Sequence, residues 1–134
     1  MIAEQTNSVE NAPVLSILVV DDDENVGKVF QRGFRQKGVE IVYFSSARQA
    51  LEWAEATTPV LAIVDVVMPD MNGVELCLAL RNRENTRELP IVLLSAVEEA
   101  ELKKLALLVK AVTFVSKPFA PRQVFEIMRS HLAS

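Results

Sequence analysis

Five short apolar runs, each followed by an amphipathic stretch, constrain the fold of this chain more than any other feature of the sequence. Four of the runs are nearly continuous in apolar residues, which is typical of strands that are buried on both faces. Strands that alternate with helices predict a doubly wound α/β domain, in which helices cover both sides of a parallel sheet. The expected strands are residues 14–20, 39–44, 60–64, 91–94 and 112–115. The expected helices are residues 24–37, a helix capped by Ser45 or Ser46, and residues 73–83, 98–110 and 121–132.

The composition fits one globular domain. Half of the 134 residues are hydrophobic, so the chain can bury a core without disulfides or a structural metal. The single cysteine, Cys77, cannot form an internal disulfide, which predicts a reducing, cytoplasmic location. A net charge of −4 argues against a direct nucleic-acid-binding surface, and no apolar run approaches the roughly 20 residues that a membrane-spanning helix needs. We expect a disordered N-terminal tail over residues 1–13 and one domain over residues 14–134.

Polar side chains end four of the five expected strands. The first strand ends in residues 21–23, all aspartates, and the third ends in Asp65. The fourth strand ends in Ser95, and Lys117 lies just after the fifth. Because ligands of doubly wound domains bind at the carboxyl ends of the strands, these side chains should share one site.

Each of these residues also has an ordinary structural explanation. The acidic run 21–23 could start a helix, where carboxylates complement the helix dipole. Asp65 could form a turn, Ser95 could cap a helix, and Lys117 could point into solvent. Their coincidence on four strand ends of one domain favours a common site.

A cluster of Asp21, Asp22 and Asp65 would be unstable without a cation. Two unit charges about 4 Å apart repel by about 4 kcal/mol at an effective dielectric constant of about 20. Ligands that are all oxygen atoms favour a hard ion such as Mg²⁺. With Lys117 and Ser95 beside it, such a site suits a phosphoryl group, and Asp65 would be the carboxylate that attacks phosphorus.

Four segments resemble the signature segments of response-regulator receiver domains of two-component signalling. They are ILVVDDDEN, IVDVVMPDMNGVEL, IVLLSA and FVSKPF, and they occur in the family's order with fitting spacings. The resemblance covers about residues 14–132. It implies a single-domain, chemotaxis-regulator-like receiver with the flavodoxin-like fold, in which five parallel strands have the order 2-1-3-4-5.

The resemblance also implies roles for the acidic residues. Asp65 would be the phosphoacceptor, and Asp22 and Asp65 would bind Mg²⁺ directly. Asp21 would bind the ion through water, and the backbone carbonyl of Val67 would supply a further ligand. The apolar side chain at Val67, where the family tunes the lifetime of the phosphoryl group, would slow its hydrolysis.

A second group of residues would report phosphorylation. Ser95 would hydrogen-bond the phosphoryl oxygen, and Lys117 would pair with the phosphorylated aspartate. Phe114 stands at the aromatic switch position, and the Lys117–Pro118 peptide bond is expected to be cis. One departure from the family concerns the turn before the fifth strand, which usually carries glycine. Lys110 stands there, and a positive φ at that position would strain it.

The expected partners are a sensor histidine kinase or a histidine phosphotransfer protein, and an unknown downstream protein. The downstream partner would bind the face made by residues 98–110, 112–115 and 121–132. Helix 98–110 contains five consecutive apolar residues, LALLV. That run is either a wide core-facing stripe with one exposed leucine or a surface for a partner or a homodimer.

Two other classes of protein share part of this pattern, and the extent of the whole protein is a separate question. A pseudo-receiver used only for docking would be favoured by loss of an acidic or lysine position, and none is lost. A phosphohydrolase of the haloacid dehalogenase type would use Asp21 and Asp23, but Asn25 stands where threonine or valine is expected. The chain is either a complete single-domain regulator or a receiver excised from a longer one, and the initial methionine and tail favour the former.

Overall fold

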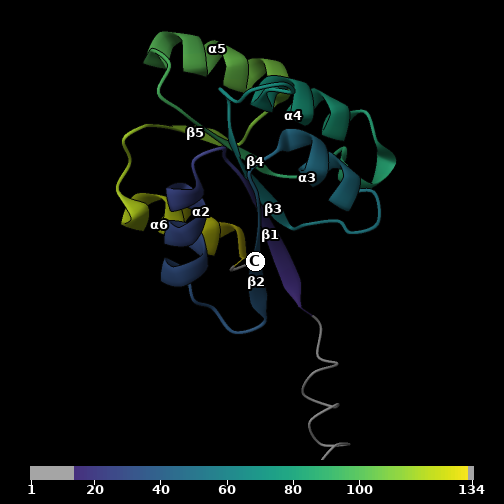
Figure 1. Ribbon diagram of the computed structural model, residues 1–134, viewed down its shortest axis with the longest axis vertical. Coiled ribbons are helices and arrows are strands. Elements are labelled where there is room, and N and C mark those ends of the chain that lie inside the picture. Colours follow the sequence, from purple (N-terminus) through teal and green to yellow (C-terminus); the bar gives the residue numbers. More distant parts are fainter. Residues whose placement is uncertain (1–13, 133–134) are drawn as a thin grey trace, which may run out of the picture.

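The computed structural model describes residues 14–132 as five strands alternating with helices (Figure 1). The strands are β1 (Leu15–Val20), β2 (Val39–Phe44), β3 (Leu61–Asp65), β4 (Ile91–Ser95) and β5 (Thr113–Ser116). The α-helices are α2 (Glu24–Gly33), α3 (Ala47–Trp53), α4 (Gly73–Arg81), α5 (Glu99–Val109) and α6 (Pro121–Leu132). A short 3-10 helix, η1 (Glu84–Thr86), follows α4. The tail predicted for residues 1–13 and the last two residues lie outside the described part of the chain.

All strand pairs are parallel, and the order β2-β1-β3-β4-β5 confirms the predicted doubly wound fold. Each strand is short and rich in β-branched residues, as expected for a sheet that is covered on both faces. β3 and β4 are buried along their whole length, including their last residues, Asp65 and Ser95. The polar ends of these strands therefore lie within the folded domain.

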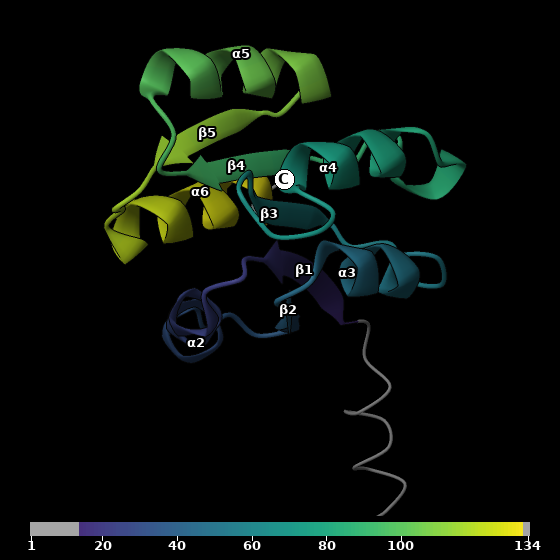
Figure 2. The same ribbon diagram turned by 45° about the horizontal axis from the view of Figure 1, so that its top comes forward.

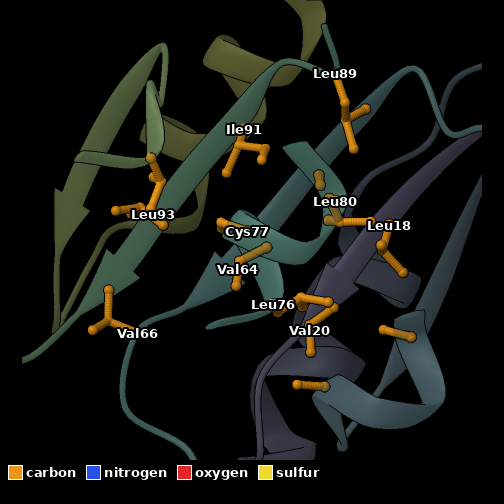
Figure 3. Packing of buried hydrophobic residues seen from close by; sticks show 14 of the residues in the cluster. Leu18, Val20, Val64, Val66, Leu76, Cys77, Leu80, Leu89, Ile91 and Leu93 are labelled. Atoms are coloured by element: carbon orange, nitrogen blue, oxygen red, sulfur yellow. The ribbon is translucent and has the colours of Figure 1, made fainter. Parts of the chain in front are cut away.

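Helices cover the two faces of the sheet unequally (Figure 2). The helices α3, α4 and α5 pack on one face, where alternate residues of β1, β3 and β4 meet Leu76, Cys77 and Leu80 of α4 (Figure 3). The helices α2 and α6 cover the other face, where Phe30 and Met128 are fully buried. The buried apolar side chains on both faces extend to the carboxyl edge of the sheet. Packing on each face therefore holds the strand ends in place.

Helix α2 is shorter than its periodicity predicts. It ends at Gly33 rather than at residue 37, because Phe34 adopts an extended backbone with φ −89° and ψ 115°. The ring of Phe34 packs edge-on against Phe125 of α6, with the ring centroids 5.7 Å apart. The apolar spacing of Phe34 therefore reflects packing between two helices and not a continuation of α2.

The turn between α5 and β5 adopts the strained backbone that the sequence indicates. Lys110 has φ 59° and ψ 43°, the left-handed region that favours glycine. The guanidinium of Arg81 stabilises this turn, because its Nε donates to the carbonyl of Val109 at 3.0 Å and its Nη2 to that of Lys110 at 3.1 Å. The same guanidinium donates to the carbonyl of Leu89 at 2.6 Å. Arg81 thus links the ends of α4 and α5 to the start of β4.

None of the helices in residues 14–132 is long and apolar enough to cross a membrane.

Candidate functional site

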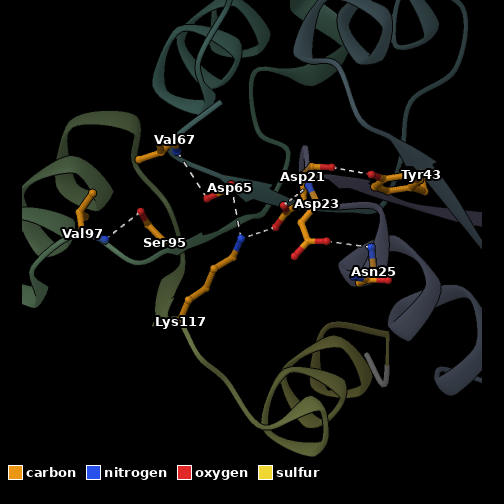
Figure 4. A network of polar contacts seen from close by, with 9 residues as sticks. All are labelled: Asp21, Asp23, Asn25, Tyr43, Asp65, Val67, Ser95, Val97 and Lys117. Carbon is orange, nitrogen blue, oxygen red and sulfur yellow. Dashed lines mark hydrogen bonds and ion pairs between the residues drawn. The ribbon is translucent and has the colours of Figure 1, made fainter. Parts of the chain in front are cut away.

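Three carboxylates and one ammonium group converge at the carboxyl edge of the sheet. Figure 4 shows two of these carboxylates, Asp21 and Asp65, with the Lys117 ammonium paired to both. Asp21 follows β1 and is fully buried, Asp65 ends β3 and is 4% exposed, and Asp22 is exposed. One carboxylate oxygen of each of the three lies within 4.8 Å of the others. The structure therefore brings together the acidic residues that the sequence predicts to share a site.

Lys117 reaches this cluster from beyond β5. Its Nζ lies 2.7 Å from Oδ2 of Asp21 and 3.4 Å from Oδ2 of Asp65. Burial by itself would lower the pKa of Lys117, but the hydrogen bond to Asp21 and the charges of Asp21 and Asp65 raise it overall. The Lys117 side chain therefore stays protonated, and its ammonium lies closer to Asp21 than to Asp65.

The environment of Asp65 perturbs its ionisation. Burial, and then the charge of Asp21, raise its pKa from 3.8 to about 6, although Lys117 and the amide of Val67 act in the opposite direction. The N–H of Val67 donates to Oδ1 of Asp65 at 3.4 Å. One lysine does not compensate for two buried carboxylates, so the site has spare capacity for positive charge.

The donor set fits a hard divalent cation. Oδ1 of Asp21 accepts a hydrogen bond from the N–H of Asp23 at 2.9 Å. Oδ2 of Asp21 is buried, and its partner among residues 14–132 is the Lys117 ammonium at 2.7 Å. A buried oxygen with an unused lone pair, next to the exposed carboxylate of Asp22, suits Mg²⁺ with several water ligands. Asp23 takes no part in the cluster, because its side chain caps α2 by accepting from the N–H of Asn25 at 2.9 Å.

Ser95 and Phe114 lie on the β5 side of the site. The hydroxyl oxygen of Ser95 is buried and accepts from the N–H of Val97 at 3.2 Å (Figure 4). Phe114 is partly buried and packs on the cluster that contains α5. The Lys117–Pro118 peptide bond is cis, as the resemblance implied. Both predicted switch residues therefore lie on the strands next to α5.

Sequence reasoning missed two residues that shape the site. Gly73, the first residue of α4, has no room for a Cβ, because that atom would overlap the backbone carbonyl of Asp65. Tyr43, near the end of β2, donates its hydroxyl to the backbone carbonyl of Asp21 at 2.6 Å. The signal for Gly73 was its place directly after Asn72, which forms a capping box with Glu75. Tyr43 gave no local signal, because its role depends on β2 lying beside β1.

The chain belongs to the response regulator receiver domain family, whose sequence model matches residues 17–129. Members of this family are phosphoaccepting switches rather than enzymes, and histidine kinases phosphorylate them. Membership therefore excludes the phosphohydrolase that Asp21 and Asp23 left open.

Relatives and solved structures agree with this assignment. The chain is 36% identical over 108 residues to the alkaline phosphatase synthesis transcriptional regulatory protein PhoP of Bacillus subtilis, covering 81% of this chain and 44% of PhoP. It is 32% identical over 116 residues to the DNA-binding response regulator MtrA of Mycolicibacterium smegmatis, covering 87% of this chain and 50% of MtrA. The chain thus spans about half the length of these curated relatives. The structure of chemotaxis protein CheY4 of Vibrio cholerae superposes with a TM-score of 0.79 at 26% identity, covering 87% of this chain and 98% of that one.

Proposed function

We propose that Asp65 accepts a phosphoryl group from a histidine kinase or a histidine phosphotransfer protein, with Mg²⁺ bound beside it. The resulting aspartyl phosphate changes the binding of a downstream protein to the face formed by α5, β5 and α6. The observation that carries this proposal is the position of Asp65: a buried carboxylate at the end of β3, between two other carboxylates and the Lys117 ammonium.

The transfer needs a nucleophile and a way to hold the new charge. A carboxylate oxygen of Asp65 would attack phosphorus while the bond from phosphorus to the donor imidazole breaks. The product carries about −1.5 to −2 charges where Asp65 carried one. Lys117 lies closer to Asp21 than to Asp65, so its flexible side chain can shift toward the new oxygens. The hydroxyl of Ser95 would turn from Val97 and donate to a phosphoryl oxygen.

Asp21, Asp22, Asp65 and the backbone carbonyl of Val67 would hold the magnesium ion. When bound, Mg²⁺ would neutralise negative charge on the phosphoryl oxygens. The carboxylates of the chain would set the position of the ion. Burial and the ion pair with Lys117 hold Asp21 in place, whereas Asp22 is exposed and can reach the water ligands of the ion. The supporting observation is that one carboxylate oxygen from each of Asp21, Asp22 and Asp65 lies within 4.8 Å of the others.

The face formed by α5, β5 and α6 carries exposed apolar side chains that a partner protein could bind. Leu107 and Leu108 of α5 are 74% and 58% exposed. Two leucines of the apolar run LALLV therefore face solvent, whereas a run that only packs on the core would expose one. A reorientation of Ser95 toward the phosphoryl group would open space beside β4 that Phe114 can fill. That movement would bias α5 and β5 between two arrangements, and so alter the surface around these leucines. A second copy of the chain could use the same face.

A phosphoryl donor can approach the site through a cavity beside Lys117. The cavity has a volume of about 450 Å³, and its lining includes Val26 and Val29 of α2 and Phe119 after β5. A mostly apolar entrance next to the acidic cluster fits the docking of a helix that carries the donor histidine.

The proposal is tested by intact mass spectrometry after incubation with acetyl phosphate and Mg²⁺, with Asp65→Ala as the matched variant. The wild type should gain one phosphoryl group, about 80 Da, and the variant should gain none. Lack of an adduct in the wild type would support a docking module instead. The decay of the adduct also tests Val67, since Val67→Asn should shorten its lifetime if the apolar side chain excludes water.

A further inference from the structure

A tyrosine on the neighbouring strand holds the backbone of the acidic site. The hydroxyl of Tyr43 donates to the backbone carbonyl of Asp21 at 2.6 Å, a short hydrogen bond that crosses from β2 to the segment after β1 (Figure 4). The two residues lie 22 positions apart in the sequence, and the pairing of β1 with β2 brings them together. The hydroxyl bonds to the main chain rather than to a carboxylate, so its influence on the site must pass through the backbone.

This hydrogen bond replaces a rung of the parallel ladder. The N–H of Asp21 still pairs with β2, donating to the carbonyl of Phe44 at 3.2 Å. In a parallel pair the carbonyl of Asp21 would next accept from the N–H of residue 46. By that point β2 has ended, and Ser46 is the N-cap of α3. The phenol of Tyr43 satisfies a backbone acceptor that the end of the strand would otherwise leave unpaired.

The bonded carbonyl belongs to the peptide unit that joins Asp21 to Asp22. Because the peptide unit is planar, a hydrogen bond to its oxygen fixes the direction in which the chain continues to Asp22. Asp21 is also fixed through its side chain, which accepts from Asp23 and pairs with Lys117. Asp22 is exposed, and the orientation of this peptide is one of the restraints on the position of its carboxylate. Without the Tyr43 hydroxyl, the peptide can rotate and carry the Asp22 carboxylate away from Asp65.

The aromatic ring of Tyr43 is itself held in place. It lies directly on the backbone of α2 at Gly27, where a Cβ would come within 2.7 Å of the ring. The short hydrogen bond to the Asp21 carbonyl uses the phenol as a donor. A clamped ring with a protonated hydroxyl is suited to a fixed positioning role.

We propose that Tyr43 is a positioning residue for the divalent cation of the acidic site: its hydrogen bond to the Asp21 carbonyl orients Asp22 toward Asp21 and Asp65. This inference rests on the proposed function, because it assigns to Tyr43 a part of the Mg²⁺ affinity of that site. Residues that orient metal ligands typically change metal affinity by roughly 10–100-fold when they are substituted.

The test is a Mg²⁺ titration of the wild type and Tyr43→Phe, followed by the amide resonances of residues 21–23 and 65–67. The variant should bind Mg²⁺ roughly tenfold more weakly. Phosphorylation by acetyl phosphate should slow at limiting Mg²⁺ and return to the wild-type rate at saturating Mg²⁺. A Tyr43→Phe protein with the wild-type dissociation constant would overturn the inference, and a wild type that binds no Mg²⁺ would overturn the proposed function as well.

Thr86→Val is the matched control for a general loss of stability. The hydroxyl of Thr86 donates to the carbonyl of Leu80, also at 2.6 Å, but at the far end of α4 from the acidic site. Thr86→Val should lower stability at least as much as Tyr43→Phe and leave the Mg²⁺ dissociation constant unchanged. Equal weakening of Mg²⁺ binding in both variants would show that the effect of Tyr43 is only structural.

Gly27→Ala perturbs the same device from the other side. The added methyl group would push the ring of Tyr43 outward without removing its hydroxyl. This variant should therefore also weaken Mg²⁺ binding. A folded Gly27→Ala protein, judged by circular dichroism, that keeps both the wild-type affinity and the Tyr43 hydrogen bond would contradict the clamping role of α2.

Discussion

Replacing Asp65 with asparagine should stabilise the Mg²⁺-free protein, although it removes the proposed phosphoacceptor. A raised carboxyl pKa means that the folded state binds the proton more tightly than the unfolded chain does. Folding is then favoured at low pH, and stability falls as the pH rises from 3.8 to about 6. The rise in the pKa of Asp65 from 3.8 to about 6 corresponds to a change in folding free energy of about 3 kcal/mol, at about 1.36 kcal/mol for each pKa unit. Asparagine carries no charge at any pH, so Asp65→Asn should be more stable than the wild type by up to about 3 kcal/mol above pH 6.

Urea unfolding of both proteins in EDTA measures this difference. At a pH of about 8 the variant should have the higher midpoint, and at about pH 4 the two midpoints should nearly coincide. Adding Mg²⁺ should raise the midpoint of the wild type more than that of the variant, because the ion binds the folded acidic site. Asp70→Asn makes the same chemical change on the exposed loop before α4 and serves as the surface control.

The reasoning fails if Asp65→Asn is less stable than the wild type at about pH 8 without Mg²⁺. A difference that does not shrink as the pH falls would also refute it. The first result would mean that Lys117 outweighs the burial of Asp65 and the charge of Asp21, contrary to the raised pKa. The second would mean that the difference in stability does not come from ionisation of Asp65.

Three further substitutions test the framework around the site. Lys110→Gly should raise the free energy of unfolding by about 1 kcal/mol, since glycine adopts the positive φ without strain; urea unfolding would check this, and a loss of stability would contradict it. Arg81→Met should cost about 2–4 kcal/mol, because carbonyls at the ends of α4 and α5 lose a charged donor, and an unchanged unfolding midpoint would contradict that linking role. Gly73→Ala should shift the backbone of Asp65 and slow phosphorylation by acetyl phosphate by roughly tenfold or more, about 1.4 kcal/mol in the barrier, whereas a wild-type rate would show that the close contact is tolerated.

Most of the fold could be predicted because each strand carries its own signal. The apolar run of β3 and its neighbours places the strand ends within one residue of their observed positions. The end of α2 could not be predicted, because Phe34 keeps helical spacing while its ring packs against Phe125 of α6. Local periodicity does not distinguish these two uses of one aromatic residue.

The same distinction applies to the site. Asp21, Asp65 and Lys117 could be predicted to meet, because a parallel sheet brings the carboxyl ends of its strands to one edge. Tyr43 could not, because a tyrosine in a strand is ordinarily a packing residue, and its hydrogen bond needs the pairing of β1 with β2. The residues that perform the proposed chemistry are therefore easier to predict than those that orient them.

The most direct test of the central claim is to locate the phosphoryl group by chemical trapping. Borohydride reduces an aspartyl phosphate to homoserine, and peptide mapping after phosphorylation with acetyl phosphate and Mg²⁺ then identifies the modified position. The account predicts homoserine at position 65, with Asp21 and Asp22 unchanged. Homoserine at position 21 or 22 instead, or a phosphorylated protein with no reducible aspartate, would contradict it.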